Sequence, residues 1–405
     1  MGIFCRWPRW RLGMLKQRWA QRVGEIEPFQ VMAVLDRARA LQEAGGDVIH
    51  MEIGEPDFST PEPIMRAAQA ALNAGHTSYT PALGLPALRE AVAGFYQQRY
   101  GIDLDPQRVV ITPGGSGALL LVSALLVDAG KRVLMADPAY PCNRHFLRLV
   151  EGQATMVATG PESGYQLTPE QIEQHWDKDC VAVLSASPAN PSGSVLSAGQ
   201  LRGMAETTRR LGGQLIVDES YHGLTYGCDA TSVLEVAPAA WVLNSFSKYF
   251  GMTGWRLGWL IAPQDAVPEL EKLAQNFYIC APHLSQAAAL AAFGDDTLAV
   301  CEARREAFHQ RRDFLLPALR ELGFAIPYTP EGAFYLYADS SAFGPDSRRL
   351  CQHLIEVEHV AITPGLDFGH HRAGEHVRFA YTSSLPRLEQ AVERMARGLK
   401  SWPGC

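Results

Sequence analysis

Short apolar runs alternate with helical stretches along the chain from residue 108 onward. The β-rich runs are "RVVIT" (108–112), "RVLMAD" (132–137), "ATMVAT" (154–159), "VAVLS" (181–185), "QLIVDE" (214–219) and "WVLNS" (241–245). Helical patterns fall between most of them, at 118–127, 144–150, 168–176 and 197–211. Nearly continuous apolar strands of this kind are buried on both faces of a sheet. The pattern therefore predicts an α/β fold with a mostly parallel central sheet flanked by helices.

The pattern changes after about residue 295. A long charged helix is expected at 302–322, followed by "GAFYLYA" (332–338), a helix near 348–358, "VAIT" (360–363), "HVRFAYTSS" (376–384) and a last helix to about 400. This arrangement predicts a smaller α+β domain. The expected division is a basic, disordered extension (1–22), an N-terminal arm and helix joining the small domain (23–45), a large domain (46–294) and a small C-terminal domain (295–405).

Composition narrows the class of protein. The 405 residues are 47% hydrophobic and 20% charged, which is ordinary globular composition for more than one domain. The net charge of -7 makes the chain a poor electrostatic match for nucleic acid. Eight scattered cysteines form no CxxC pair, which favours a reducing, cytoplasmic compartment over a disulfide framework or a zinc site.

The first 22 residues carry six Lys or Arg, three Trp and no acidic residue. A basic aromatic segment can lie on an anionic membrane surface, but this one lacks the unbroken apolar stretch of a signal peptide. We expect an untethered extension, produced by a start codon chosen upstream of Met14. The apolar "ALLLVSALLV" is about half the length of a spanning helix, so no stable membrane insertion is expected.

Polar residues gather where the predicted strands end. Gly115–Gly117, Asn190, Asp218 and Ser245 all follow a strand. In parallel sheets, ligands bind outside the carboxyl ends of the strands. A glycine turn leading into a helix offers free N–H groups that suit phosphate. Taken singly, these residues also fit a plain glycine turn, turn chemistry at Asn190 and a helix-capping Asp218.

Lys248 lies in "NSFSKYFGMTGWRLGW" (244–259), among aromatic and small residues with no acidic residue in the segment. Arg256 follows eight positions later. A free lysine with a pKa near 10.4 is protonated, so it reacts only if burial and a nearby cation lower that pKa. "SFSK" also fits the S-x-x-K pattern of β-lactam-binding enzymes, but the S-D-N and K-T-G motifs are missing, so this interpretation is set aside.

Ten motifs in order resemble one family. They are "GEPDF" (54–58), "YTPALGLPALREA" (79–91), "GGSGAL", "DPAYP", "NPSG", "DESY", "SKYFGMTGWRLG", "GAFY", "TPGLDFG" (363–369) and "VRFAYTSS" (377–384). The sequence resembles the class I/II aminotransferases, pyridoxal-5'-phosphate (PLP) enzymes of fold type I. The resemblance runs from about residue 27 to the last helix. It implies a PLP-dependent transfer of an amino group between an α-amino acid and a 2-oxo acid.

The resemblance also implies a role for each motif residue. Lys248 would be the catalytic lysine, holding PLP as an internal aldimine and moving the substrate proton. Asp218 would pair with the pyridine nitrogen, an interaction of about 4 kcal/mol at ~4 Å and an effective dielectric near 20. The remaining cofactor contacts would be Tyr140 on the ring face, Asn190 and Tyr221 at the phenolic oxygen, and Gly115, Ser116, Gly117, Ser245 and Arg256 at the phosphate. Arg378, Gly54 and Asn190 would bind the substrate, with Arg378 clamping its α-carboxylate.

The family further implies a homodimer in which Tyr79 reaches the phosphate site of the other subunit. Members that act on dicarboxylic amino acids often carry a second cation, sometimes a lysine in the turn matching "GGSGAL". Ser116 stands in this turn without a lysine. Aromatic or aliphatic donors with 2-oxoglutarate or pyruvate are therefore expected, while an arginine from a partner subunit leaves aspartate open.

Two other functions share these residues. A PLP lyase that eliminates a β-substituent, breaking a C–S bond, would use the same lysine, although "GEPDF" and "TPGLDFG" favour a transaminase. A PLP-binding regulator would need a DNA-binding domain that the short basic extension cannot form. The turn 365–376 offers His370, His371 and His376 near two acidic residues, but it lacks recognised ligand spacing. We expect no metal there, only solvated histidines in an exposed loop.

Overall fold

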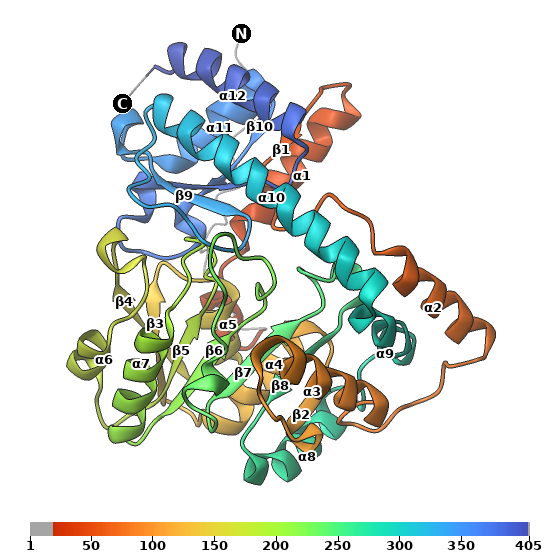
Figure 1. The fold of residues 1–405 in the computed structure, drawn as a ribbon. Helices are drawn as coiled ribbons and strands as arrows, with labels where there is room; N and C mark the ends of the chain where they lie inside the picture. Colours follow the sequence, from red (N-terminus) through yellow and green to blue (C-terminus); the bar gives the residue numbers. More distant parts are fainter. Residues whose placement is uncertain (1–18, 404–405) are drawn as a thin grey trace.

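The computed structural model describes residues 19–403, so most of the predicted basic extension lies outside the described residues. A seven-stranded sheet forms the centre, in the order β2-β8-β7-β6-β5-β3-β4 (Figure 1). Its strands are β2 (Val109–Thr112), β3 (Arg132–Asp137), β4 (Gln153–Ala158), β5 (Cys180–Ala186), β6 (Gln214–Asp218), β7 (Trp241–Ser245) and β8 (Gly258–Ile261). The predicted α/β class and the six predicted strands of this sheet are confirmed.

The sheet is mixed because of β8, which the sequence pattern did not predict. This strand pairs antiparallel with both β2 and β7, whereas β3 to β7 pair parallel throughout. Its four residues, "GWLI", are completely buried. A run of four apolar residues beginning with glycine is too short to separate from a buried turn by periodicity.

Alternate residues along the central strands enter two different hydrophobic cores. In β2, Val109 and Ile111 pack into one core, while Val110 packs into the other. In β5, Val183 lies in the first core and Leu184 in the second. Successive side chains of a strand point to opposite faces, so a sheet covered on both sides needs apolar residues at every position. This explains the unbroken apolar runs in the sequence.

Helices cover both faces of the sheet (Figure 1). They are α2 (Glu62–Asn73), α3 (Pro86–Tyr100), α4 (Gly114–Leu126), α5 (Cys142–Leu149), α6 (Pro169–His175), α7 (Ala198–Arg210), α8 (Val267–Phe277) and α9 (His283–Ala289). α10 (Asp295–Glu321) crosses from the neighbourhood of α9 to the C-terminal elements. It begins about two turns before the predicted helix at 302–322.

The C-terminal elements form a second layered unit. An antiparallel sheet joins β11 (Thr363–Pro364), β12 (His376–Ala380) and β9 (Tyr335–Asp339), beside helices α11 (Ser347–Glu358) and α12 (Leu385–Lys400). The N-terminal helix α1 (Gln30–Glu43) packs on this unit, and β1 (Ile49–His50) pairs with β10 (Val360–Ala361). α1 and β1 therefore lie with the C-terminal elements, as the red and blue segments in Figure 1 show.

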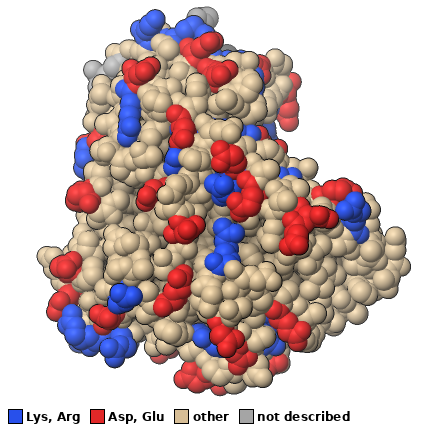
Figure 2. All heavy atoms as spheres, viewed as in Figure 1, with Lys and Arg blue, Asp and Glu red and all other residues tan. Residues whose placement is uncertain are grey.

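Acidic and basic side chains are interspersed on the face drawn in Figure 2, with no broad area of one sign. None of the helices within residues 19–403 combines the length and apolar composition needed to cross a bilayer.

Candidate active site

A cavity of about 240 Å³ lies at the carboxyl ends of the central strands. The last residues of three neighbouring strands line it: Ala186 of β5, Asp218 of β6 and Ser245 of β7. The remaining motif residues that line it are Gly54, Gly115, Ser116, Tyr140, Asn190, Tyr221, Lys248, Arg256 and Arg378. The fold thus brings together residues from position 54 to position 378 of the chain.

Lys248 occupies this cavity just after the end of β7. Its Nζ donates a hydrogen bond to the carbonyl oxygen of Gly54 at 2.6 Å and lies 5.8 Å from the ring centre of Tyr221. Burial, opposed by the Glu55 carboxylate and reinforced by Arg378, lowers the pKa of Lys248 to about 8. An amine with this pKa is partly unprotonated near neutral pH and can act as a nucleophile or base.

Asp218 places a carboxylate in the same cavity. Burial raises its pKa, and this effect is opposed by the Ser220 backbone N–H, which donates to Oδ1 at 2.9 Å. The Lys248 ammonium also favours the ionised form. A carboxylate so placed is stabilised by a cationic partner in the cavity, such as a protonated ring nitrogen.

Arg378 enters from β12 and is almost completely buried. Its Nη1 donates to Asn190 Oδ1 at 2.9 Å and its Nη2 donates to the Glu52 carbonyl at 2.5 Å. The guanidinium carbon lies 4.2 Å from the ring centre of Tyr335. Its buried Nε has no partner among the described residues. Arg378 lines the cavity, and a buried cation at a cavity wall is suited to an anionic ligand.

The glycine turn and Arg256 form another end of the site. Gly114 and Gly115 begin α4, and no side chain caps its first turn. Arg256 adopts a left-handed conformation (φ 49°), and its guanidinium approaches so closely that a Cβ on Gly114 would lie 2.6 Å from Nη2. Helix N–H groups next to an arginine suit a phosphate group.

Two phenols and a glycine form the wall near Lys248. Tyr221 and Tyr335 share a hydrogen bond of 2.8 Å between their hydroxyls. A Cβ on Gly54 would lie 1.9 Å from Tyr335 Oη. No side chain fits at position 54 unless Tyr335 moves away from Tyr221.

Two predicted site residues do not line the cavity. Gly117 is buried, and a Cβ there would lie 2.8 Å from Pro113 Cδ, so the residue serves the packing of the turn. Tyr79 is 78% exposed. In this chain, Tyr79 therefore lies outside the cavity.

The sequence did not indicate an apolar part of the cavity wall. Phe29, Val31, Met32, Ile53, Leu119 and Phe146 line it, together with Ser220, Ser247 and Tyr335. Asp367, within "TPGLDFG", fixes the start of α1 by accepting from the N–H groups of Gln30 (2.8 Å) and Val31 (3.3 Å). The motif showed an aspartate at this position, but the sequence did not show that it binds residues more than 330 positions earlier.

The histidine turn differs from the expected exposed loop. His370 and His371 are exposed, but His376 is buried and stacks on Tyr337 with ring centres 4.8 Å apart. The expectation of three solvated histidines is therefore wrong for His376, because it is the first residue of strand β12. Residues 19–403 contain no group of three or more His, Cys, Asp or Glu side chains that could hold a metal ion.

A buried amine with a lowered pKa, a carboxylate and two arginines line one cavity, an arrangement suited to chemistry between amines and carbonyl compounds. Comparison with known proteins gives the family. The family profile described as "Aminotransferase class I and II" matches residues 46–395. The chain belongs to the class I and II aminotransferase family, which uses PLP, and it is an aminotransferase.

Individual relatives match along almost the whole chain. A valine–pyruvate aminotransferase of Mycobacterium tuberculosis is 40% identical over 389 residues, covering 96% of this chain and 100% of the relative. A crystal structure of an aminotransferase from the same organism has a TM-score of 0.92 at 39% identity, covering 95% and 99% of the two chains. The aspartate aminotransferase of Thermus thermophilus with maleate has a TM-score of 0.89 at 33% identity, covering 94% and 99%. These matches identify the activity as transamination and not as the lyase or the regulator considered from the sequence.

Proposed function

We propose that Lys248 holds PLP covalently and moves the proton during amino-group transfer. The observation that carries this proposal is the placement of its buried amine, with a pKa lowered to about 8, in a cavity between a carboxylate and two anion-binding ends. When bound, PLP supplies an electron-withdrawing ring that makes the Cα proton of an amino acid removable. We propose that the amine of Lys248, which lies in the cavity, is the base that accepts this proton.

We propose the roles of the other site residues from where they lie in the structure. Asp218 holds the ring nitrogen cationic, Tyr140 packs on the ring face, and Asn190 and Tyr221 contact the phenolic oxygen. The phosphate is held by Gly115, Ser116, Gly117, Ser245 and Arg256. Gly117 contributes only by shaping the turn at the start of the helix. Arg378 binds the substrate α-carboxylate, supported by the position of this cation in the cavity wall. Gly54 allows the substrate to approach, because it adds no side chain to the wall.

We propose that the amino donor has an apolar side chain, as valine has. Of the described residues that line the cavity, three are cationic: Lys248, Arg256 and Arg378. The cofactor and the α-carboxylate account for all three, so none remains for a distal carboxylate. The apolar wall formed by Phe29, Met32 and neighbouring residues instead suits a hydrocarbon side chain. The relative named valine–pyruvate aminotransferase supports this donor class and pyruvate as acceptor.

A panel of amino acids tested with pyruvate and with 2-oxoglutarate examines this donor class. Valine and similar apolar donors should exceed aspartate in kcat/KM by at least ten-fold, because the distal carboxylate of aspartate would lose its hydration against the apolar wall without a cationic partner. Equal or better turnover of aspartate would contradict the proposal. Omitting the 2-oxo acid should limit the reaction to one half-turnover, without continuous release of ammonia.

We also propose a homodimer. Tyr79 is exposed outside the cavity of its own subunit, where it is free to reach the phosphate site of the other subunit. Other apolar side chains are also exposed. Met65 and Leu72 lie on α2, shortly before Tyr79 in the sequence, and Leu290 follows α9, the helix that packs on α2. Exposed apolar side chains on neighbouring elements favour burial against a partner.

The predicted domain division remains a proposal. The seven-stranded sheet falls within 46–294, and the three-stranded sheet falls within 295–405. Residues 49–50 pair with 360–361, so the first residues of the large domain lie against the small one. Six cysteines of the described chain are free thiols, which supports the expected cytoplasmic compartment.

A further inference from the structure

The segment 218–222, "DESYH", presents different side chains to two environments. Asp218, Ser220 and Tyr221 line the cavity. Glu219 and His222 do not line it and are buried, with 0% and 6% of their surface exposed. A carboxyl group and an imidazole are costly to bury, so their contacts need an explanation.

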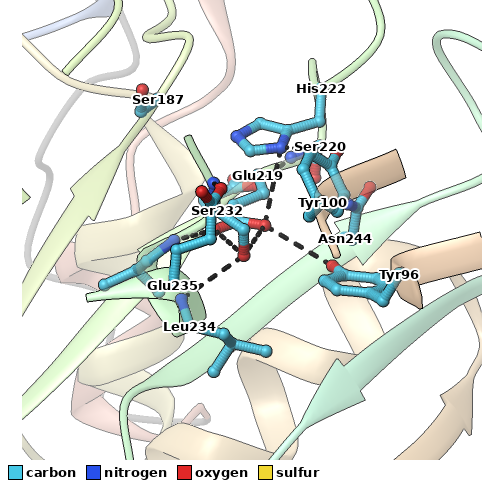
Figure 3. Close-up of polar contacts among 12 residues, drawn as sticks. Tyr96, Tyr100, Ser187, Glu219, Ser220, His222, Ser232, Leu234, Glu235 and Asn244 are labelled. Atoms are coloured by element: carbon cyan, nitrogen blue, oxygen red, sulfur yellow. Dashed lines mark hydrogen bonds and ion pairs between the residues drawn. The ribbon is translucent and has the colours of Figure 1, made fainter. Parts of the chain in front are cut away.

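Glu219 is held by hydrogen bonds on both carboxyl oxygens (Figure 3). Its Oε1 accepts from the Val233 N–H at 2.8 Å and from Ser232 Oγ at 3.0 Å. Its Oε2 lies 3.4 Å from the Tyr96 hydroxyl. The Glu219 backbone N–H donates to the Leu243 carbonyl of β7 at 2.8 Å. The residue therefore links the segment to three other parts of the chain.

His222 fixes the other end of the segment. Its Nδ1 lies 2.9 Å from the Tyr100 hydroxyl of α3, and its backbone N–H donates to the Glu219 carbonyl at 2.8 Å. Its Nδ1 is 3.6 Å from Glu219 Oε2, and Figure 3 shows both side chains converging with the two tyrosines. The buried Nε2 has no hydrogen-bond partner among the described residues.

Burial disfavours the charged forms of both Glu219 and His222. Burial raises the pKa of Glu219 to about 8, although hydrogen bonds from Val233 and Ser232 oppose the shift. Burial, aided by the charge of Arg99, lowers the pKa of His222 to about 3. Burial therefore favours a hydrogen-bonded network over an ion pair in this cluster.

We propose that Glu219 and His222 are positioning residues that hold segment 218–222 from its buried side, so that Asp218 and Tyr221 face the cofactor correctly. The inference rests on the proposed function, because it assigns the cofactor contacts to Asp218 and Tyr221. Asp218 itself is held through its Oδ1 by the Ser220 N–H of the same segment. Its position therefore depends on how the segment is anchored.

Three variants test this role. Glu219→Ala removes the anchor, Glu219→Gln keeps its size and hydrogen bonding, and Glu235→Gln is a matched control. Glu235 is exposed and accepts from the Ser232 N–H at 2.8 Å. Two properties are measured: the dissociation constant for PLP on loading the cofactor-free enzyme, and the pH midpoint of the visible absorption of the loaded enzyme.

Glu219→Ala should weaken PLP binding at least ten-fold and shift the absorption midpoint, while Glu219→Gln should restore both. Glu235→Gln should match the wild type. If Glu219→Ala does not fold, Tyr100→Phe removes the hydroxyl that holds His222 and should shift the same midpoint in the same direction.

A lower melting temperature with an unchanged midpoint and PLP affinity would overturn the positioning role and leave a purely structural one. Equal losses in Glu219→Ala and Glu219→Gln would also overturn it. Failure of the proposed function looks different, because the wild-type protein would then show no visible absorption with PLP.

Discussion

Gly54 and Tyr335 show how a missing side chain shapes the site. The Gly54 carbonyl accepts from Lys248, and a Cβ at this position would lie 1.9 Å from Tyr335 Oη. Gly54→Ala should displace Tyr335 and break its hydrogen bond to Tyr221. We expect kcat/KM to fall at least ten-fold, about 1.4 kcal/mol, in steady-state assays with an apolar donor.

Gly94→Ala is the matched control for that variant. Gly94 is exposed on α3, and an added Cβ there would meet no atom within 4 Å. Alanine should stabilise the helix by up to about 1 kcal/mol without changing kcat/KM. Wild-type kinetics in Gly54→Ala would show that the contact between the glycine and Tyr335 has no role.

The raised pKa of Glu219 gives a pH dependence of stability. The group ionises near its ordinary value of 4.5 when unfolded but near 8 when folded. The unfolded state therefore binds fewer protons between these values, and Glu219 makes the protein less stable as pH rises from about 4.5 to 8. In Glu219→Gln this loss is absent. Its free energy of unfolding, relative to wild type, should increase between about pH 5 and 8 in denaturant titrations of cofactor-free protein.

A constant difference between the two proteins across that range would contradict an uncharged Glu219. Glu235→Gln again serves as the control, because it keeps the buried Glu219 carboxyl group and removes only a minor cause of its raised pKa, so its trend should be much smaller.

At the scale of elements, α1 forms part of the cavity through its first turn. Phe29 and Met32 line the cavity, and Phe29 packs edge-on against Tyr140 with ring centres 6.2 Å apart. Asp367 holds this turn by accepting from the N–H groups of Gln30 and Val31. The residues just before α1 also contact α5 through ion pairs, including Arg144 with Glu27 at 3.2 Å.

Asp367→Asn should loosen the first turn of α1. Asparagine keeps only one acceptor oxygen, so one of the two hydrogen bonds to the N–H groups of Gln30 and Val31 is lost, at a cost of about 1 kcal/mol. Because Phe29 and Met32 would become less fixed, discrimination between valine and alanine in kcat/KM should decrease. PLP binding should be retained, since Asp367 does not line the cavity. Unchanged discrimination would show that α1 does not select the donor side chain.

The elements also show what the sequence can predict. The central strands β2 to β7 were predictable because each is an apolar run bounded by turn residues. β8 was not, because its run of four residues begins only two positions after Arg256, whose backbone is left-handed, and is too short to be recognised by periodicity. His376 was misplaced for a similar reason: a glycine-rich turn and the start of β12 share one short stretch of sequence.

At the scale of the whole molecule, the site joins distant parts of the chain. Arg378 bonds to Asn190 across 188 positions, and the α1 residues meet Asp367 across more than 330. Motif order indicated that Asn190 and Arg378 share one site. It did not indicate their direct hydrogen bond, nor the contribution of Phe29 and Met32, because no local pattern distinguishes an apolar residue lining a cavity from one in the core.

The proposed dimer has a direct test with two defective variants. Lys248→Ala lacks the amine, and Tyr79→Ala lacks the hydroxyl proposed to serve the other subunit's phosphate site. Unfolding and refolding the two variants together should form hybrid dimers with one intact site, so activity should exceed the sum of the separate variants. Refolding each variant alone is the control. No gain in the mixture, or a monomer in sedimentation analysis, would contradict the shared site.

The central claim is that Lys248 carries the cofactor, and covalent trapping tests it most directly. The protein loaded with PLP is reduced with borohydride and digested, and the peptide that carries the pyridoxyl group is identified by mass spectrometry. We predict a yellow protein that loses its visible absorption on reduction, with the label on Lys248 and no labelled peptide from Lys248→Ala. A label on another lysine, or an unlabelled wild-type protein, would contradict the account.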